Sequence, residues 1–98
     1  MLDLEQSRAI VGDWIREKRT ETGLGRVRFA RHCEALGCAA IHSDSIRYWE
    51  AAKQMPEAYT LAGLLEALEP DLKKRQAILA AKLRLDQATF ARILGSTI

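Results

Sequence analysis

The chain has 98 residues, of which 48% are hydrophobic, with 15 Lys and Arg against 13 Asp and Glu. This length fits one small domain with a modest core. No run of about 18 apolar residues is present, which excludes a membrane-spanning helix, and the acidic first 13 residues are unlike a signal peptide. Two cysteines are too few for a disulfide-rich secreted scaffold, so we expect a protein of the reducing cytoplasm.

The net charge of +2 conceals an uneven distribution of charge along the chain. Residues 1–13 carry a net charge of −2, residues 14–53 carry +3, residues 54–71 carry −4 and residues 72–98 carry +5. Two basic blocks are therefore separated by an acidic one. Such a pattern is typical of a nucleic-acid-binding face, although solvated helix faces produce it too.

The helical spacing of the apolar residues predicts five or six short helices and no strand. The first helix runs from Asp3, its N-cap, to Gly23. The second begins at Gly25 and ends at Gly37, and its expected buried residues are Val27, Phe29, Ala30, Cys33 and Leu36.

A turn over residues 38–42 precedes the third predicted helix, which extends to about residue 53. Either Ser43 or Asp44 can cap this helix, because both side chains can accept a hydrogen bond from a free N–H of the first turn. The expected buried side holds Ile46 and Trp49.

Three further helices are predicted in the remainder of the chain. The fourth has Pro56 in its first turn, the fifth is capped by Asp71, and the sixth is capped by Asp86 and stopped by Gly95. Their expected inward residues are Leu61, Leu64, Leu65 and Leu68, then Leu72, Ile78, Leu79 and Leu83, then Phe90, Ile93 and Leu94. We divide the chain into a first unit at 1–69 and a helical extension at 70–98.

A set of fixed spacings covers residues 14–68. Arg19 stands four residues before Gly23-Leu24, and Phe29-Ala30 follows on the next helix. The third helix ends in Ile46, Trp49 and Glu50, after which Pro56 and Thr60-Leu61 lead into a leucine-rich helix. In these features the segment resembles the lambda-repressor/Cro-type (XRE family) helix-turn-helix domain.

The resemblance implies an all-α, lambda-repressor-like bundle and a transcriptional regulator that binds double-stranded DNA sequence-specifically. It also implies that Arg19 and Glu50 pair across the first and third helices.

One departure from the family pattern is the spacing from Phe29 to Ile46, which is 17 residues and about six longer than usual in the family; the extra residues fall around 34–41. Another is Arg26, which replaces a frequent Gln and keeps a phosphate-binding role, since its guanidinium can donate two hydrogen bonds to one phosphate. Residues 45–50 are also similar to MerR-type regulators, a reading that changes the architecture but not the DNA binding.

The predicted recognition helix, about residues 43–53, fits the major groove, where its first residues reach base edges. Arg47 is the best candidate for a guanine contact, worth roughly 1–3 kcal/mol of discrimination. Asp44 is repelled by phosphate, so it either accepts from cytosine or caps the helix. The arginines of the second helix suit the DNA backbone, unless they form only a solvated basic face. We predict base contacts from Ser43, Asp44, Ser45, Arg47 and Tyr48, and phosphate contacts from Arg26, Arg28, Arg31 and Lys53.

The eleven residues from His32 to His42 also contain Cys33 and Cys38, which suggests a zinc site. No Cys-x-x-Cys pair is present, however, and Cys33 is expected to be buried, so we favour two inert thiols and predict no metal and no cofactor. The chain shows no partnered nucleophile, glycine-rich phosphate loop or spaced carboxylate pair, so we predict that it is not an enzyme.

The C-terminal segment repeats part of the motif. An offset of 61 residues aligns residues 24–31 with residues 85–92, matching Leu24, Phe29, Ala30 and Arg31 with Leu85, Phe90, Ala91 and Arg92. We interpret residues 85–98 as a dimerising element of a homodimer, with a truncated second motif or a helix packed on the core as alternatives.

The alternative to DNA binding for the chain as a whole is a protein-interaction module, such as an antitoxin or phage-type inhibitor, which the long turn and the acidic residues 54–71 favour.

Overall fold

The first helix, α1, spans Leu4–Thr22 and is the longest of the six helices in the computed structural model, which describes residues 1–96. The Asp3 carboxylate accepts from the Gln6 backbone N–H, and the Gln6 side chain accepts from the Asp3 N–H. This reciprocal pair satisfies two donors that a helix start leaves free. At the other end Gly23 adopts a left-handed conformation with φ of 71°, which glycine does without a Cβ penalty. Both predicted ends of the helix are confirmed.

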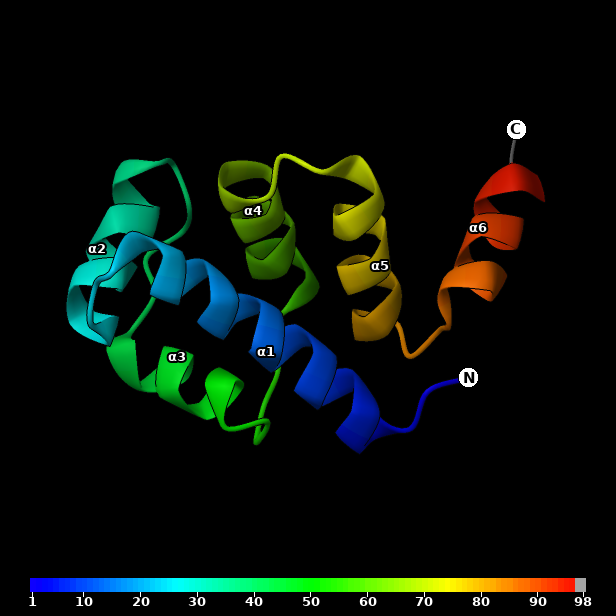
Figure 1. Cartoon of the computed structure of the whole chain (residues 1–98), viewed down its shortest axis with the longest axis horizontal. Coiled ribbons are helices and arrows are strands. Elements are labelled where there is room, and N and C mark those ends of the chain that lie inside the picture. Colours follow the sequence, from blue (N-terminus) through cyan, green and yellow to red (C-terminus); the bar gives the residue numbers. More distant parts are fainter. Residues whose placement is uncertain (97–98) are drawn as a thin grey trace.

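Five further helices follow α1, and no strand occurs within residues 1–96. They are α2 (Arg26–Ala35), α3 (Ser43–Glu50), α4 (Ala58–Leu68), α5 (Leu72–Lys82) and α6 (Gln87–Ser96). The all-α fold class is therefore confirmed. In Figure 1, α1 runs diagonally across the molecule, with α2 and α3 at one end, α5 at the other and α6 beyond α5.

Four predicted helix ends were wrong. The cap of α3 is neither Ser43 nor Asp44 but His42, whose Nδ1 accepts from the Asp44 N–H at 3.1 Å. Helix α3 ends at Glu50, so this helix does not reach residue 53 as predicted. Helix α4 begins at Ala58 because Glu57 has an extended backbone, which leaves Pro56 buried in the preceding loop. At the C-terminal end, α6 continues through Gly95 instead of stopping there.

One hydrophobic core collects residues from α1 to α5, with α1 at its centre. Because α1 lies between α3 and α5, it is covered along much of its length. The prediction of inward apolar residues was wrong at six positions, which are 38% to 67% exposed: Val27, Leu36, Leu72, Leu83, Ile93 and Leu94. In α2 the residues Phe29, Ala30 and Cys33 already fill the contact surface. The core residues are Val11, Trp14, Ile15, Phe29, Ala30, Cys33, Cys38, Ile46, Trp49, Leu61, Leu64, Leu65, Ile78 and Ala81.

Helices α1 and α3 cross very closely at Gly12. A Cβ atom built on this buried glycine would lie less than 3.0 Å from the carbonyl oxygen of Trp49. No side chain larger than hydrogen fits there without moving one of the two backbones. Gly12 therefore fixes the distance between α1 and α3.

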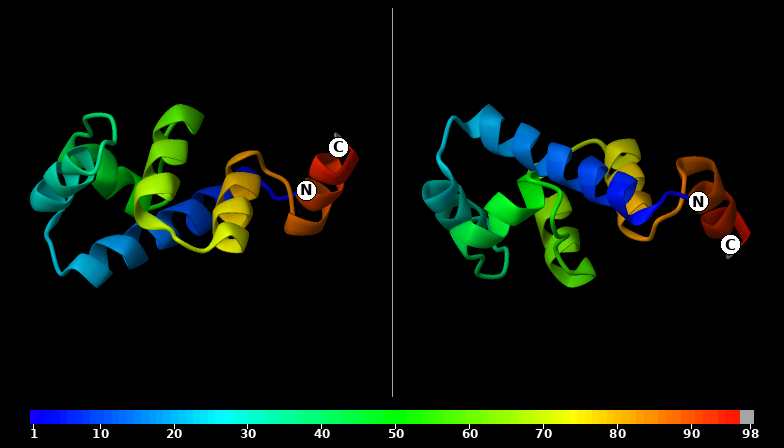
Figure 2. Two further views of the ribbon diagram at one scale, coloured as in Figure 1. Left: turned by 90° about the horizontal axis from the view of Figure 1, so that it is seen from above. Right: turned by 90° about the horizontal axis from the view of Figure 1, so that it is seen from below.

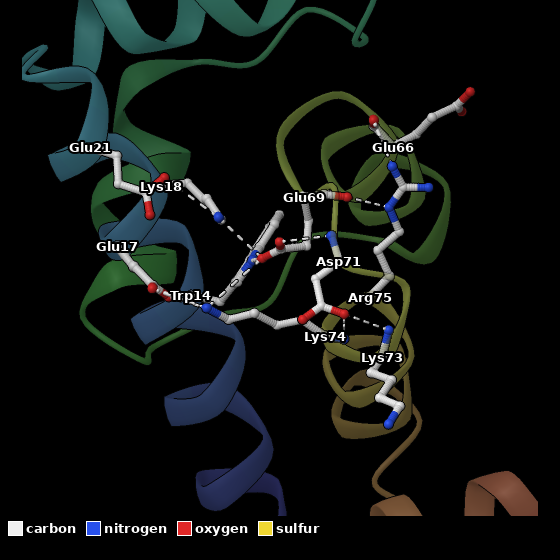
Figure 3. Close-up of polar contacts among 10 residues, drawn as sticks. All are labelled: Trp14, Glu17, Lys18, Glu21, Glu66, Glu69, Asp71, Lys73, Lys74 and Arg75. Carbon is white, nitrogen blue, oxygen red and sulfur yellow. Dashed lines mark hydrogen bonds and ion pairs between the residues drawn. The ribbon is translucent and has the colours of Figure 1, made fainter.

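A buried polar cluster fastens α1 to the connection between α4 and α5 (Figure 3). The Trp14 indole N–H donates to Glu69 Oε1 at 2.9 Å, and Lys18 Nζ lies 3.2 Å from the same oxygen. The other carboxylate oxygen accepts from the Asp71 N–H at 3.3 Å, while Arg75 donates to the Glu69 backbone carbonyl. The side chains of Glu69 and Lys18 are only 3% and 9% exposed. Each buried charge thus has an opposite charge and hydrogen bonds, as low-dielectric burial requires.

The turn after α3 contains a strained residue, and this gives a first prediction. Ala52 has φ of 59°, a left-handed conformation that costs an L-residue roughly 1–2 kcal/mol. We expect Ala52→Gly to raise the free energy of unfolding by about 0.5–1 kcal/mol, after the larger entropy of glycine in the unfolded chain is deducted. Urea unfolding measures the change. The matched control is Ala51→Gly, at φ of −83°, which should destabilise; an equal loss in both variants would contradict the prediction.

Candidate nucleic-acid interface

Helix α3 has one side fixed to the core and the other open. Ile46 and Trp49 are 1% and 7% exposed, whereas Asp44, Arg47 and Tyr48 lie at the surface. The Arg47 guanidinium carbon lies 5.2 Å from the centroid of the Tyr48 ring, and one of its nitrogens lies 3.6 Å from Asp44 Oδ1. Three of the predicted base-contacting residues therefore form one cluster on the outward face of α3.

The two predicted serines lie on the flanks of α3 and not within this cluster. Ser43 is half-buried and lines a cavity of about 300 Å³ between α2 and α3, together with Arg31. Ser45 is also half-buried and lines a separate cavity of about 330 Å³, together with His42 and Trp49. Both serines are thus less accessible to a large partner than Asp44, Arg47 and Tyr48.

The predicted phosphate-binding residues lie on α2 and in the turn after α3. Arg26, Arg28 and Arg31 are exposed on α2, and Lys53 is exposed in the turn that follows α3. Seen from below (Figure 2, right), α3 lies open to the viewer between α1 and α2. Within residues 1–96, no hydrogen bond or ion pair joins the Lys53 side chain to the others.

The C-terminal end of α3 is held by three arginines around one buried carboxylate, which we call the Glu50 cluster (Arg16, Arg19, Arg26 and Glu50). Arg19 Nε and Nη2 donate to the two oxygens of Glu50 at 2.6 and 2.8 Å. Arg26 Nη2 donates to Oε1 at 3.3 Å, and Arg16 Nη2 donates to the Glu50 backbone carbonyl at 2.7 Å. The expected Arg19–Glu50 pair is therefore present, and it is part of a larger group that ties α1, α2 and α3 together.

The carboxylates of Glu50 and Glu69 make stability depend on acidity. Burial alone would raise the pKa of Glu50, but the hydrogen bond and charge of Arg19, with a smaller contribution from Arg26, lower it below the usual 4.5. Burial opposes ionisation at Glu69 as well, and the hydrogen bonds from Trp14 and Lys18 likewise leave its pKa lowered. A lowered folded-state pKa stabilises the fold above the unfolded-state pKa, and this stabilisation is lost as the pH falls through the folded-state value.

We therefore expect a urea midpoint that changes little between about pH 7 and pH 5 on account of these two groups, and that falls as the pH drops below about 4.5. Urea titrations at a series of pH values measure this dependence. In Glu69→Gln the acid-dependent loss should be smaller than in the parent chain. A midpoint that rises as the pH falls below 4.5 would contradict the assignment.

The long turn between α2 and α3 packs toward α4. It covers residues 36–42, and within it the Cys38 thiol donates to the Gly63 carbonyl of α4 at 3.6 Å. The seven residues between α2 and α3 therefore form a turn that contacts α4, and the outward face of α3 stays exposed.

The two cysteines are buried and free. Burial raises the pKa of the Cys33 thiol to about 12 and raises that of Cys38 as well, so both thiols stay protonated at neutral pH. Among residues 1–96, no group of three or more His, Cys, Asp and Glu side chains is arranged to hold a metal ion.

Two contributors to the site were missed in the sequence. Arg16 stands three residues before Arg19 and so shares its helix face, a spacing that could have indicated a joint role. His42 caps α3 although histidine is not among the preferred capping residues, so residue preferences alone did not predict this cap.

Comparisons with known proteins identify no relative: no family model, no curated protein and no solved structure matches the chain. In the part of the chain that the structure describes, no helix combines the length and apolarity needed to cross a bilayer.

Proposed function

We propose that this chain binds double-stranded DNA, with α3 in the major groove, and regulates transcription as a lambda-repressor-like protein. The observation that carries the proposal is the exposed Arg47, together with Asp44 and Tyr48, on a helix whose opposite side is fixed to the core. A rigidly held helix presents its side chains at fixed positions, as the reading of base edges requires.

Arg47 has the chemistry to read guanine, because its guanidinium can donate two hydrogen bonds to O6 and N7. Its contact with Asp44 is a partly exposed ion pair, which is worth little and is readily exchanged for a base. Stacking on Tyr48 orients the guanidinium before a partner arrives. Ser43 and Ser45 are secondary candidates, since both are half-buried.

Exposed basic side chains on either side of α3 support the same function. Arg28 and Arg31 on α2 and Lys53 after α3 are candidates for phosphate contacts, which would position the domain on the duplex. Arg26 is a fourth candidate, although part of its hydrogen-bonding capacity is used by Glu50. We include a homodimer on a two-fold symmetric site in the proposal, since single helix-turn-helix units commonly bind in pairs.

Selection of bound duplexes from a random library, followed by a salt titration of the winning sequence, tests the proposal. We expect the affinity to fall steeply with salt concentration, because phosphate contacts release counterions, and the selected sites to show two related halves. Arg47→Ala should lose discrimination of roughly 1–3 kcal/mol at one base pair and keep non-specific binding. Lys73→Ala, an equal charge change at an exposed position on α5, is the control. Absence of binding to any duplex at low salt would overturn the proposal.

A protein-interaction module is the second candidate, and the exposed apolar residues of α2 and of the turn after it favour it. Val27 and Leu36 are 56% and 49% exposed, more than a phosphate-binding helix needs. Under this alternative, Val27→Asp should abolish binding of a protein partner while Arg47→Ala leaves it intact. Under the DNA-binding proposal Arg47→Ala has the larger effect.

A further inference from the structure

The Glu50 cluster holds more positive charge than its structural role uses. Within the cluster, three guanidinium groups face one carboxylate, which is an excess of two positive charges. Outside it, Asp13, Glu17 and Glu21 line a surface hollow with Arg16. The central pair is saturated: Arg19 is 20% exposed, donates to both Glu50 oxygens and also donates to the Leu24 carbonyl. Hydrogen bonding to Glu50 raises the pKa of Arg19, against the opposing effect of burial. Arg19 is therefore a structural residue.

The two outer arginines are different. The side chains of Arg16 and Arg26 are 52% and 41% exposed. Arg26 donates one hydrogen bond to Glu50 Oε1, and Arg16 donates one to the Glu50 backbone carbonyl. A guanidinium has five N–H donors, and the remaining donors of both side chains have no hydrogen-bond partner among residues 1–96. Arg26 is thus anchored by one hydrogen bond, and Arg16 by one hydrogen bond and an ion pair of 3.8 Å, while most of their donors face solvent.

We propose that Arg16 and Arg26 together bind one DNA phosphate, as a phosphate clamp that Glu50 positions, and that α1 thereby joins the DNA interface. This inference rests on the proposed function. Arg16 is the new element, because it brings a phosphate-binding group from a helix outside the helix-turn-helix. A buried carboxylate that is already neutralised by Arg19 keeps both outer guanidinium groups near the C-terminal end of α3. A phosphate that arrives there meets donors that are already ordered, so less side-chain entropy is lost on binding.

The competing reading is purely structural. The Glu50 carbonyl lies in the last turn of α3 and has no partner within the helix, so Arg16 satisfies a carbonyl that would otherwise be free. This role explains one donor of Arg16 but neither the exposure of the rest nor the presence of Arg26 on the other side. A measurement that responds to phosphate contacts and not to folding separates the two readings.

The slope of log affinity against log salt concentration on the selected duplex is that measurement, because each phosphate contact contributes about 0.9 to it. We expect Arg16→Gln to reduce the slope by about 0.9 without changing base preference, and Arg16→Lys to keep it near the parent value, since the charge remains. Lys73→Gln removes the same charge from an exposed position on α5, at the opposite end of α1 from α2 and α3 (Figure 1), and should leave the slope unchanged. Thermal unfolding of each variant, measured in parallel, verifies that the protein is folded at the temperature of the assay.

The outcomes distinguish this inference from the proposed function. If Arg16→Gln binds with an unchanged slope while Arg28→Gln reduces it, the clamp is wrong and the DNA-binding function stands. If the parent chain binds no duplex at low salt, the proposed function itself fails. If Arg16→Lys loses as much slope as Arg16→Gln, the charge is not what matters and the clamp is likewise wrong.

Discussion

Replacing Gly12 with alanine is expected to lower the free energy of unfolding by about 3 kcal/mol, the upper part of the usual range for overpacking. The added Cβ would meet the backbone carbonyl of Trp49, which cannot rotate away as a flexible side chain would. Relief requires α1 and α3 to separate, which disturbs the contacts of Trp49 and of the Glu50 cluster at the same time. Small domains have a total stability of about 5–15 kcal/mol, so this loss is large.

Gly63→Ala provides a matched control for this experiment. Gly63 lies in the middle of α4, and a Cβ atom there would have no heavy atom within 4 Å. Because alanine favours the helix over glycine by up to about 1 kcal/mol, Gly63→Ala should stabilise the protein. Urea unfolding followed by tryptophan emission measures both variants. Equal effects of the two substitutions would show that helix propensity, and not the close crossing, governs Gly12.

Replacing Glu69 with alanine is expected to cost about 3 kcal/mol, at the low end for breaking a buried ion pair. The change leaves Lys18 buried without its close partner and removes the acceptor of the Trp14 indole N–H. We choose the low end because Lys18 also lies 3.5 Å from Glu21, whose side chain is 56% exposed, so part of the charge is still compensated.

Two further variants sharpen this test. Glu66→Ala removes an exposed carboxylate three residues earlier on α4, and its effect should stay within about 0.5 kcal/mol. Glu69→Gln keeps an acceptor for Trp14 but loses the charge, so its stability should fall between those of the parent chain and Glu69→Ala. Thermal and urea unfolding measure all three, and a Glu69→Ala variant as stable as Glu66→Ala would contradict the role of the cluster.

The parts of the fold that local chemistry determines were predictable from the sequence. The Asp3 side chain caps the start of α1, and Gly23, which has no side chain, can adopt the left-handed conformation that ends it, so both ends of α1 were predicted correctly. The Arg19–Glu50 pair followed from the resemblance and is present at 2.6 Å. The exposure of Arg47 followed from the periodicity of α3, since Ile46 and Trp49 define its inner side.

Long-range geometry was not predictable in the same way. The bond from Trp14 to Glu69 joins residues 55 positions apart, and no local pattern specifies such a contact. Arg16 and Arg26 meet Glu50 only because α1 and α2 both reach the end of α3. The exposure of Val27 and Leu72 could not be read from periodicity either, because it depends on which neighbouring helix covers each apolar side chain.

The central position of α1 has a consequence for the order of folding. Its inner side is completed by Ile78 and Ala81 of α5 as well as by residues of α2 to α4. During synthesis, α1 leaves the ribosome before α5, so some of the side chains that cover it emerge much later. A nascent chain that ends before α5 therefore exposes part of the apolar surface around Trp14 and Ile15, and contacts this distant in sequence slow folding relative to bundles of sequential hairpins.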